Sequence, residues 1–95
     1  MNKYTHRIPI IVSKCNNSKL PMIDKEKFLV PKDMNLGQFI YIIRKRIQLD
    51  SKEALFVLIN NSLQPSSKLI QDIYESQKDE DGFLYIVYSS ENTFG

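Results

Sequence analysis

Few side chains in this sequence have the types and spacing that catalysis requires. His6 is the only histidine and Cys15 the only cysteine, so a thiol nucleophile would have a single candidate base. His6 lies in a short polar arm, and Cys15 follows an apolar run. We therefore interpret His6 as a surface residue and Cys15 as a packed or idle thiol. A single cysteine cannot form an intramolecular disulfide, which fits a reducing compartment.

The carboxylates and glycines do not predict an active site either. The only cluster of acids, Asp79-Glu80-Asp81, lacks the spacing of a calcium-binding loop and is interpreted as a solvated turn. The glycines at 37, 82 and 95 are too far apart to form a glycine-rich phosphate loop. The sequence therefore predicts no cofactor, no bound metal and no enzyme activity.

The residue best suited to chemistry is the last one, Gly95. It ends a polar stretch without periodicity, residues 89–95, and Phe94 precedes it. A terminal glycine has no side chain to hinder attack at its carbonyl carbon, and a flexible stem lets it enter a narrow active site. Activation as an adenylate and transfer through a thioester both benefit from these properties. We interpret residues 89–95 as a flexible tail that presents a conjugation point.

One domain, residues 1–88, must carry this tail, with residues 1–6 as a loose arm. Runs of β-branched and aromatic residues predict strands, and apolar residues at helical spacing predict helices. We expect the last strand to be buried on both faces, and the third to be central because it is wholly apolar. The expected strands are Arg7–Lys14, Lys27–Pro31, Leu55–Ile59 and Gly82–Tyr88, and a short second helix should start at Ser66 or Ser67.

The longest expected element is an amphipathic helix that Asn35 can cap, with Gln38 in the capping-box position. The basic run 44–46 lies in its last turns, where positive charge suits the helix dipole. Ile42 lies off the main apolar face, on a flank that Phe39 shares, and forms an apolar shoulder that the core does not require. The main face consists of Leu36, Phe39, Ile40, Ile43 and Ile47.

The order of elements is strand, strand, helix, strand, helix, strand. A close first pair of strands followed by a long amphipathic helix is typical of a mixed sheet with one helix across it. The sequence thus predicts an α+β, ubiquitin-like β-grasp fold with a four-stranded mixed sheet, one long helix across it and a second short helix. The alternative, a ferredoxin-like sandwich, needs a helix within residues 15–26, which their composition does not favour.

Charge is unevenly distributed along the chain. Residues 1–52 carry a net charge of +7 and residues 53–95 a net charge of −5, although the whole chain carries only +2. If the fold separates these halves, the basic side would favour acidic peptides or an anionic membrane; the alternative is an ordinary solvated surface.

The basic run 44–46 has no RNA-binding aromatic motif beside it, so we expect no nucleic-acid partner. No apolar run reaches the length of a membrane span.

The first two strands have apolar residues on both faces. Pro9 and Ile11 lie on the second face of the first strand, and Leu29 lies beside Lys25 and Lys27 on that of the second. If the second strand has an open edge, an extended peptide could add to it as a further strand, with alternate side chains in pockets. The alternative is that the arm, the loops or the second helix cover these faces.

Segments spread over nearly the whole chain, from about residue 6 to the end, share one pattern. They are Lys27-Phe-Leu-Val-Pro-Lys-Asp, Leu36-Gly-Gln-Phe-Ile-Tyr-Ile-Ile-Arg-Lys-Arg-Ile, Lys78-Asp-Glu-Asp-Gly-Phe-Leu-Tyr and Glu91-Asn-Thr-Phe-Gly95, supported by Arg7-Ile-Pro-Ile-Ile and residues 65–74. Together these segments resemble the autophagy ubiquitin-like modifiers, the relatives of the GABA-receptor-associated protein.

The resemblance implies a modifier that activating and conjugating enzymes join through Gly95 to phosphatidylethanolamine, and that a dedicated cysteine protease releases. It implies a monomeric cytoplasmic protein that is attached to the autophagosome membrane when lipidated, where it recruits cargo receptors with an aromatic-x-x-aliphatic motif. One alternative is a ubiquitin-like peptide-binding adaptor in vesicle trafficking that is never conjugated. Another is a sulfur carrier, which Phe94-Gly95 fits less well than a Gly-Gly end would.

By motif position, the resemblance also implies a peptide-binding groove. Arg7 and Lys25 would favour acidic residues beside the peptide motif. Members usually begin with two further helices, whereas about six residues precede the first strand here, so we expect a shallower aromatic pocket. The pocket for the peptide aromatic would consist of Pro9, Ile11, Lys27, Leu29 and Phe83, and the aliphatic pocket of Phe28, Val30, Pro31, Met34, Phe39, Ile42 and Arg46.

Overall fold

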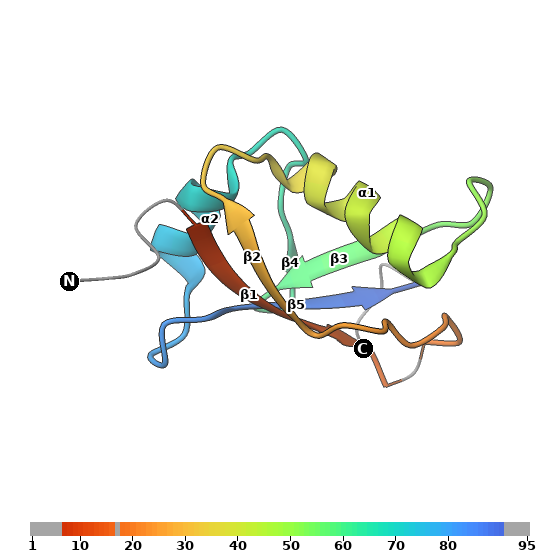
Figure 1. Cartoon of the computed structure of the whole chain (residues 1–95). Coiled ribbons are helices and arrows are strands. Elements are labelled where there is room, and N and C mark those ends of the chain that lie inside the picture. The colour runs from red at the N-terminus through yellow and green to blue at the C-terminus, as the bar shows by residue number, and fades with distance from the viewer. Residues whose placement is uncertain (1–6, 17, 91–95) are drawn as a thin grey trace.

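The computed structural model describes residues 7–16 and 18–90. The strands are β1 Arg7–Lys14, β2 Lys27–Pro31, β3 Phe56–Ile59, β4 Ser62–Leu63 and β5 Leu84–Ser89, and the helices are α1 Leu36–Ile47 and α2 Ile70–Gln77. The strands form one mixed sheet in the order β2-β1-β5-β3-β4. Figure 1 shows α1 lying across one face of this sheet and α2 near the start of β1. The expected mixed sheet with one helix across it is therefore present.

The sheet has five strands, so the prediction of four was wrong. β1 pairs antiparallel with β2 and parallel with β5, and β3 pairs antiparallel with both β5 and β4. The missed strand, β4, has only two residues and follows β3 through a tight hairpin. Asn60 and Asn61 form its turn with φ of 52° and 63°, a left-handed conformation that asparagine adopts more readily than most residues.

The core lies between α1 and the sheet. Leu36, Phe39 and Ile43 of α1 are buried against the inner face of the strands. Tyr88 of β5 is also fully buried, and its hydroxyl donates a hydrogen bond to the carbonyl of Pro21 at 2.6 Å. This bond ties the segment between β1 and β2 to the core. None of the residues described between 15 and 26 is helical, which contradicts the ferredoxin-like alternative.

The cap of α1 is the one that the sequence predicts. The Asn35 side chain accepts from the Gln38 amide at 2.8 Å, and the Gln38 side chain accepts from the Asn35 amide at 2.9 Å. The start of α2 was predicted wrongly, because this helix begins at Ile70 instead of at Ser66 or Ser67. The carbonyls of residues 66 and 68 accept from the amides of residues 37 and 36, and so satisfy free donors in the first turn of α1.

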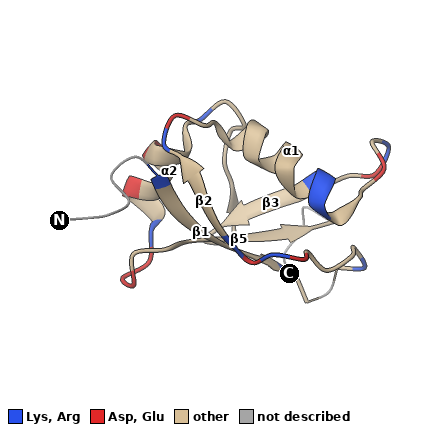
Figure 2. Cartoon of the chain, viewed as in Figure 1, with Lys and Arg blue, Asp and Glu red and all other residues tan. Residues whose placement is uncertain are grey.

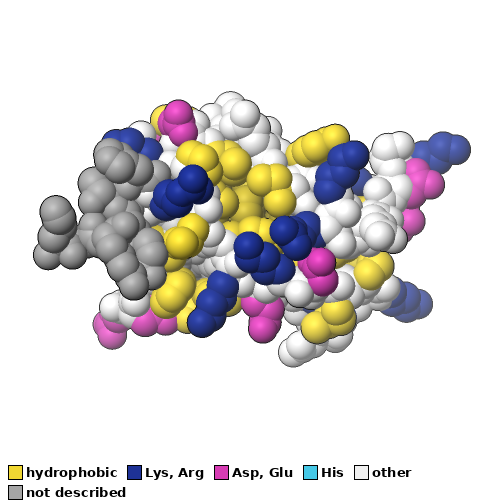
Figure 3. All heavy atoms as spheres, in the orientation of Figure 1, with side chains coloured by type: hydrophobic (Ala, Val, Ile, Leu, Met, Phe, Trp, Pro, Cys, Tyr) yellow, Lys and Arg dark blue, Asp and Glu magenta, His cyan; other side chains and the backbone are white. Residues whose placement is uncertain are grey.

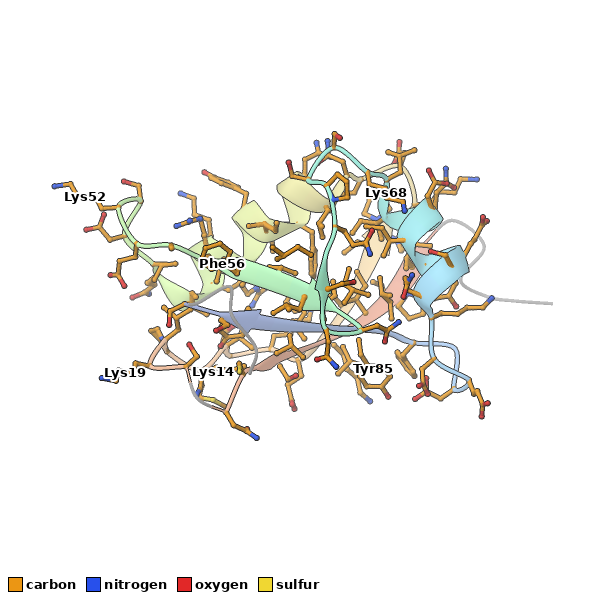
Figure 4. The ribbon with its side chains drawn as sticks, turned by 180° about the vertical axis from the view of Figure 1, so that it is seen from behind. Lys14, Lys19, Lys52, Phe56, Lys68 and Tyr85 are labelled. Carbon is orange, nitrogen blue, oxygen red and sulfur yellow. The ribbon has the colours of Figure 1, made fainter. Side chains whose placement is uncertain are left out.

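The last strand is not buried on both faces, contrary to prediction. Leu84, Ile86 and Tyr88 face the core and are fully buried, whereas Tyr85 is 43% exposed. Tyr85 projects from the face of the sheet turned away from α1 (Figure 4). β5 nevertheless lies at the centre of the sheet, while the apolar β3 lies one position from an edge. The outer face of the sheet is therefore partly open to solvent.

The two charged halves of the sequence are only partly separated in space. The acidic residues of α2 and of the loop after it lie at one end of the molecule, and the basic run 44–46 ends α1 at the other (Figure 2). Lys68 lies next to α2, however (Figure 4). The molecule therefore has a basic end without being fully bipolar.

Candidate functional site

β2 forms one edge of the sheet, and no other strand among the described residues pairs with its outer side. The β1–β2 register places Leu29 opposite Pro9 and Lys27 opposite Ile11. Because side chains alternate along a strand, these four residues lie on the outer face, and Phe28 lies on the core side. A strand edge that no other strand covers, beside apolar side chains, is suited to the addition of an extended peptide.

A cavity of about 360 Å³ opens beside this edge. Leu29 is 47% exposed in it, and Lys25 and Lys27 are exposed at its rim. The cavity thus has apolar walls and a cationic rim. Its lining residues are Pro9, Lys25, Lys27, Phe28, Leu29 and Phe83.

The structure brings together four of the five residues predicted for the aromatic pocket, together with Lys25. Ile11, the fifth, is half-buried and is not among the lining residues. Phe28 was expected only in the aliphatic pocket but also lines this cavity. The exposed guanidinium of Arg7 donates to the carbonyl of Leu29 at 3.2 Å, which places its charge beside the cavity.

Phe83 reaches the cavity from a loop that hydrogen bonds hold in shape. The Phe83 amide donates to the Asp81 carboxylate at 2.9 Å, and the Phe83 carbonyl accepts from the Asp79 amide at 2.8 Å. The Tyr74 hydroxyl of α2 donates to the carbonyl of Gly82 at 2.6 Å. Gly82 has a φ of 89°, which glycine adopts without steric cost. The cluster of acids that the sequence suggested was a solvated turn therefore supports one wall of the cavity.

Tyr85 completes this loop by donating a hydrogen bond to the Asp81 carboxylate. This bond, followed by the bond from the Phe83 amide, lowers the pKa of Asp81 below its ordinary 3.8. The same carboxylate raises the pKa of Tyr85 above its ordinary 10.0. A lowered folded-state pKa means that the Asp81 contribution to stability is present above pH 3.8 and is lost as the pH falls through the folded pKa. The Tyr85 contribution is present below pH 10.0 and is lost as the pH rises further.

Tyr85→Phe should therefore raise the pKa of Asp81 toward its ordinary value and flatten the loss of stability at both extremes of pH. A carbon-13 NMR titration of the Asp81 carboxyl measures the first effect, and urea unfolding across pH measures the second. Tyr41→Phe, which removes an exposed hydroxyl from α1 instead, is the matched control. An unchanged Asp81 titration in Tyr85→Phe would contradict this assignment.

The residues predicted for the aliphatic pocket lie where β2 approaches α1. Of these residues, Val30 and Phe39 are buried in the core. The Phe39 and Phe28 rings meet edge to face, with centroids 5.4 Å apart. Figure 3 shows hydrophobic side chains gathered between β2 and α1, with Lys and Arg side chains around them. The predicted members that keep some exposure are Pro31, Met34, Ile42 and Arg46.

Phe28 joins the two regions and lies beside two cations. The Lys25 ammonium is 5.1 Å from the centroid of its ring, and the Arg46 guanidinium carbon is 5.6 Å from it. Arg46 also forms an ion pair with Asp24 at 3.3 Å. Sequence reasoning missed Asp24, because the pair joins residues 22 positions apart and no local pattern indicates it.

The other chemical candidates remain separate from this groove. Cys15 is half-buried in a hollow of about 280 Å³ on the outer face of the sheet. Arg44 and Lys45 line another hollow with Tyr41 on α1. In the part of the chain that the structure describes, no group of three or more His, Cys, Asp or Glu could hold a metal ion. Likewise, no described helix has the length and hydropathy to cross a membrane. The predicted positions His6, Phe94 and Gly95 lie outside the described residues.

A mixed sheet crossed by one helix, with an open edge strand and an adjacent cavity, defines an α+β ubiquitin-like protein. The family described as "Autophagy protein Atg8 ubiquitin like" matches residues 1–95. Among curated proteins, Autophagy-related protein 8e of Arabidopsis thaliana is 56% identical over 93 residues, covering 98% of this chain and 76% of the relative. Autophagy-related protein 8 of Pichia angusta is 57% identical over 93 residues, covering 98% and 74%.

Solved structures agree with this match. The crystal structure of Trypanosoma brucei ATG8 has a TM-score of 0.86 at 52% identity, covering 95% of this chain and 78% of that one. Plasmodium falciparum Atg8 in complex with a Plasmodium falciparum Atg3 peptide has a TM-score of 0.84 at 41% identity, covering 94% and 80%. The chain belongs to the Atg8 family of autophagy ubiquitin-like proteins, which are modifiers and not enzymes. It spans about three quarters of the length of these curated relatives.

Proposed function

We propose that this protein is a modifier that is joined through Gly95 to phosphatidylethanolamine and gathers autophagy partners through aromatic-x-x-aliphatic peptides. The observation that carries the proposal is the open edge of β2 beside a cavity with apolar walls and a lysine rim. Membership of the Atg8 family supports it, as does the Plasmodium falciparum neighbour solved with an Atg3 peptide.

Peptide binding at this edge follows from strand addition. An extended peptide would hydrogen-bond to the free side of β2, and its alternate side chains would point toward the sheet face and the cavity. The aromatic side chain would enter the cavity against Leu29 and Phe83, and the aliphatic one would pack on Ile42 and Met34. Lys25, Lys27 and Arg7 would attract acidic residues beside the motif. A peptide from an Atg3 protein is therefore one of the first to test.

The proposed conjugation would use the carboxylate of Gly95. Activation by ATP would convert the Gly95 carboxylate into an acyl adenylate and release pyrophosphate. An enzyme thiol would then displace AMP to form a thioester, and the amine of phosphatidylethanolamine would displace the thiol to form an amide. Each attack occurs at a carbonyl carbon that no side chain shields. The product carries two acyl chains, which suffice for stable attachment to a membrane.

Incubation with activating and conjugating enzymes, ATP and phosphatidylethanolamine liposomes tests the proposal. We expect a product whose mass increases by one phosphatidylethanolamine less one water, and we expect none from a variant that lacks Gly95. A known family member conjugated in parallel controls for enzyme activity. If no adduct forms while the control protein is conjugated, the lipidation proposal is contradicted. Peptide binding without an adduct would favour the unconjugated adaptor.

A further inference from the structure

One ion pair stands out at the junction between the cavity and α1. The Arg46 guanidinium reaches from the last turn of α1 to the segment before β2, where one nitrogen lies 3.3 and 3.4 Å from the two carboxylate oxygens of Asp24. No other salt bridge within 4.0 Å is present among residues 7–16 and 18–90. Its side chains are exposed, 38% for Arg46 and 67% for Asp24, so both can be reached from solvent.

This ion pair adjoins the cavity beside β2 through Phe28, although neither Arg46 nor Asp24 is a lining residue. Arg46 and Lys25 both lie beside the Phe28 ring, which lines the cavity, and Lys25 is itself a lining residue. Because Phe28 also contacts Phe39 beneath the aliphatic region, it lies between the two sites proposed for the peptide side chains. A peptide residue between the aromatic and the aliphatic positions would therefore approach Arg46 and Lys25.

We infer that Asp24 determines the specificity of this groove: it is an internal anion that occupies Arg46 and that an acidic side chain of the bound peptide displaces. The inference rests on the proposed peptide-binding function and names a residue of that site. Asp24 would reduce the advantage of acidic over neutral peptides, because a peptide carboxylate gains Arg46 only by replacing a carboxylate already there.

The exposure of the ion pair makes displacement feasible. Exposed ion pairs contribute little free energy. The Asp24–Arg46 pair involves a single guanidinium nitrogen, so its replacement by a peptide carboxylate should cost little free energy. Lys25 makes no ion pair among the described residues and adds a cation that Asp24 does not neutralise. A neutral peptide would leave the Asp24–Arg46 pair intact, so the pair would not change the affinity for that peptide.

Two peptides that differ only by Glu or Gln between the aromatic and aliphatic residues would measure this preference. The readout is the ratio of their dissociation constants, Gln peptide over Glu peptide, from calorimetry at low salt. Asp24→Asn should raise this ratio about threefold, within the range that exposed ion pairs allow. Glu26→Gln removes the same charge at a position two residues from Asp24. The Glu26 side chain makes no ion pair in the described structure, so this variant should raise the ratio much less.

Arg46→Gln closes the thermodynamic cycle. In that background Asp24→Asn should change the ratio no more than Glu26→Gln does, because the competing cation is gone. Equal effects of Asp24→Asn and Glu26→Gln in the wild-type background would overturn the inference and leave only general electrostatics. A fall in the ratio in Asp24→Asn would also overturn it, since Asp24 would then orient Arg46 for the peptide. If folded wild-type protein binds neither peptide, the peptide-binding function itself fails, and this inference with it.

Discussion

Replacing Leu29 with aspartate should weaken binding of an aromatic-x-x-aliphatic peptide by about thirtyfold or more, the effect expected when an interface hot spot worth about 2 kcal/mol is lost. Leu29 lines the cavity beside β2 and is 47% exposed before a peptide arrives. A carboxylate there would be desolvated by the peptide aromatic, and it would draw Lys27 away from peptide acids. Fluorescence anisotropy with a labelled peptide measures the loss.

The matched control is Leu63→Asp, the same substitution on the opposite edge of the sheet. Leu63 lies on β4 and is 52% exposed, so the change in charge and hydropathy is the same on a similarly exposed side chain. This variant should bind the peptide as the wild type does. If both variants lose peptide binding equally, the binding site is not specific to the β2 edge. If neither variant loses binding, Leu29 is not part of the peptide-binding site.

Replacing Phe39 with alanine should lower the free energy of unfolding by about 3–5 kcal/mol, a large share of the roughly 5–15 kcal/mol typical of a domain. Phe39 is fully buried on α1, and its ring packs against Phe28. Its loss would leave a cavity between helix and sheet. Because Phe28 also lines the groove, peptide binding should weaken as well. Urea unfolding followed by circular dichroism measures the change.

Tyr41→Ala provides the comparison on the same helix. Tyr41 is 59% exposed and its ring lies under the Lys45 ammonium, so its removal leaves the core unchanged. Both substitutions end in alanine, so the gain in helix propensity is similar. Tyr41→Ala should lower the free energy of unfolding by less than about 1 kcal/mol. Equal losses in the two variants would show that the core does not depend on Phe39.

Local patterns predicted most of the elements of this fold. β1 and β2 have the bounds expected from their β-branched and apolar runs, and α1 has the cap expected from Asn35 and Gln38. The wrong start of α2 arose because distant segments compete for the same hydrogen bonds. Residues 66–68 could have opened α2, but two of their carbonyls bond to the first turn of α1 instead. β4 was missed because a strand of two residues has no periodicity to detect.

The residues of the peptide-binding groove were predicted from a resemblance, and the structure shows where the described ones lie. Pro9, Lys27, Leu29 and Phe83 meet in one cavity, although Phe83 lies more than fifty positions from the others. Ile11 shares their face of the sheet without lining the cavity. Asp24 was outside the prediction, since its partner Arg46 is 22 positions away.

The amino-acid sequence by itself determined where β1, β2 and α1 form, how α1 begins and which face of α1 enters the core. These depend on side-chain spacing and on hydrogen bonds between near neighbours, which a linear pattern records. Only the tertiary structure decided that β2 is an edge, that Tyr85 and Leu29 stay exposed, and that Asp24 meets Arg46 beside Phe28. Exposure and pairing depend on which distant segments cover a residue, and the spacing of residues along a chain does not encode that.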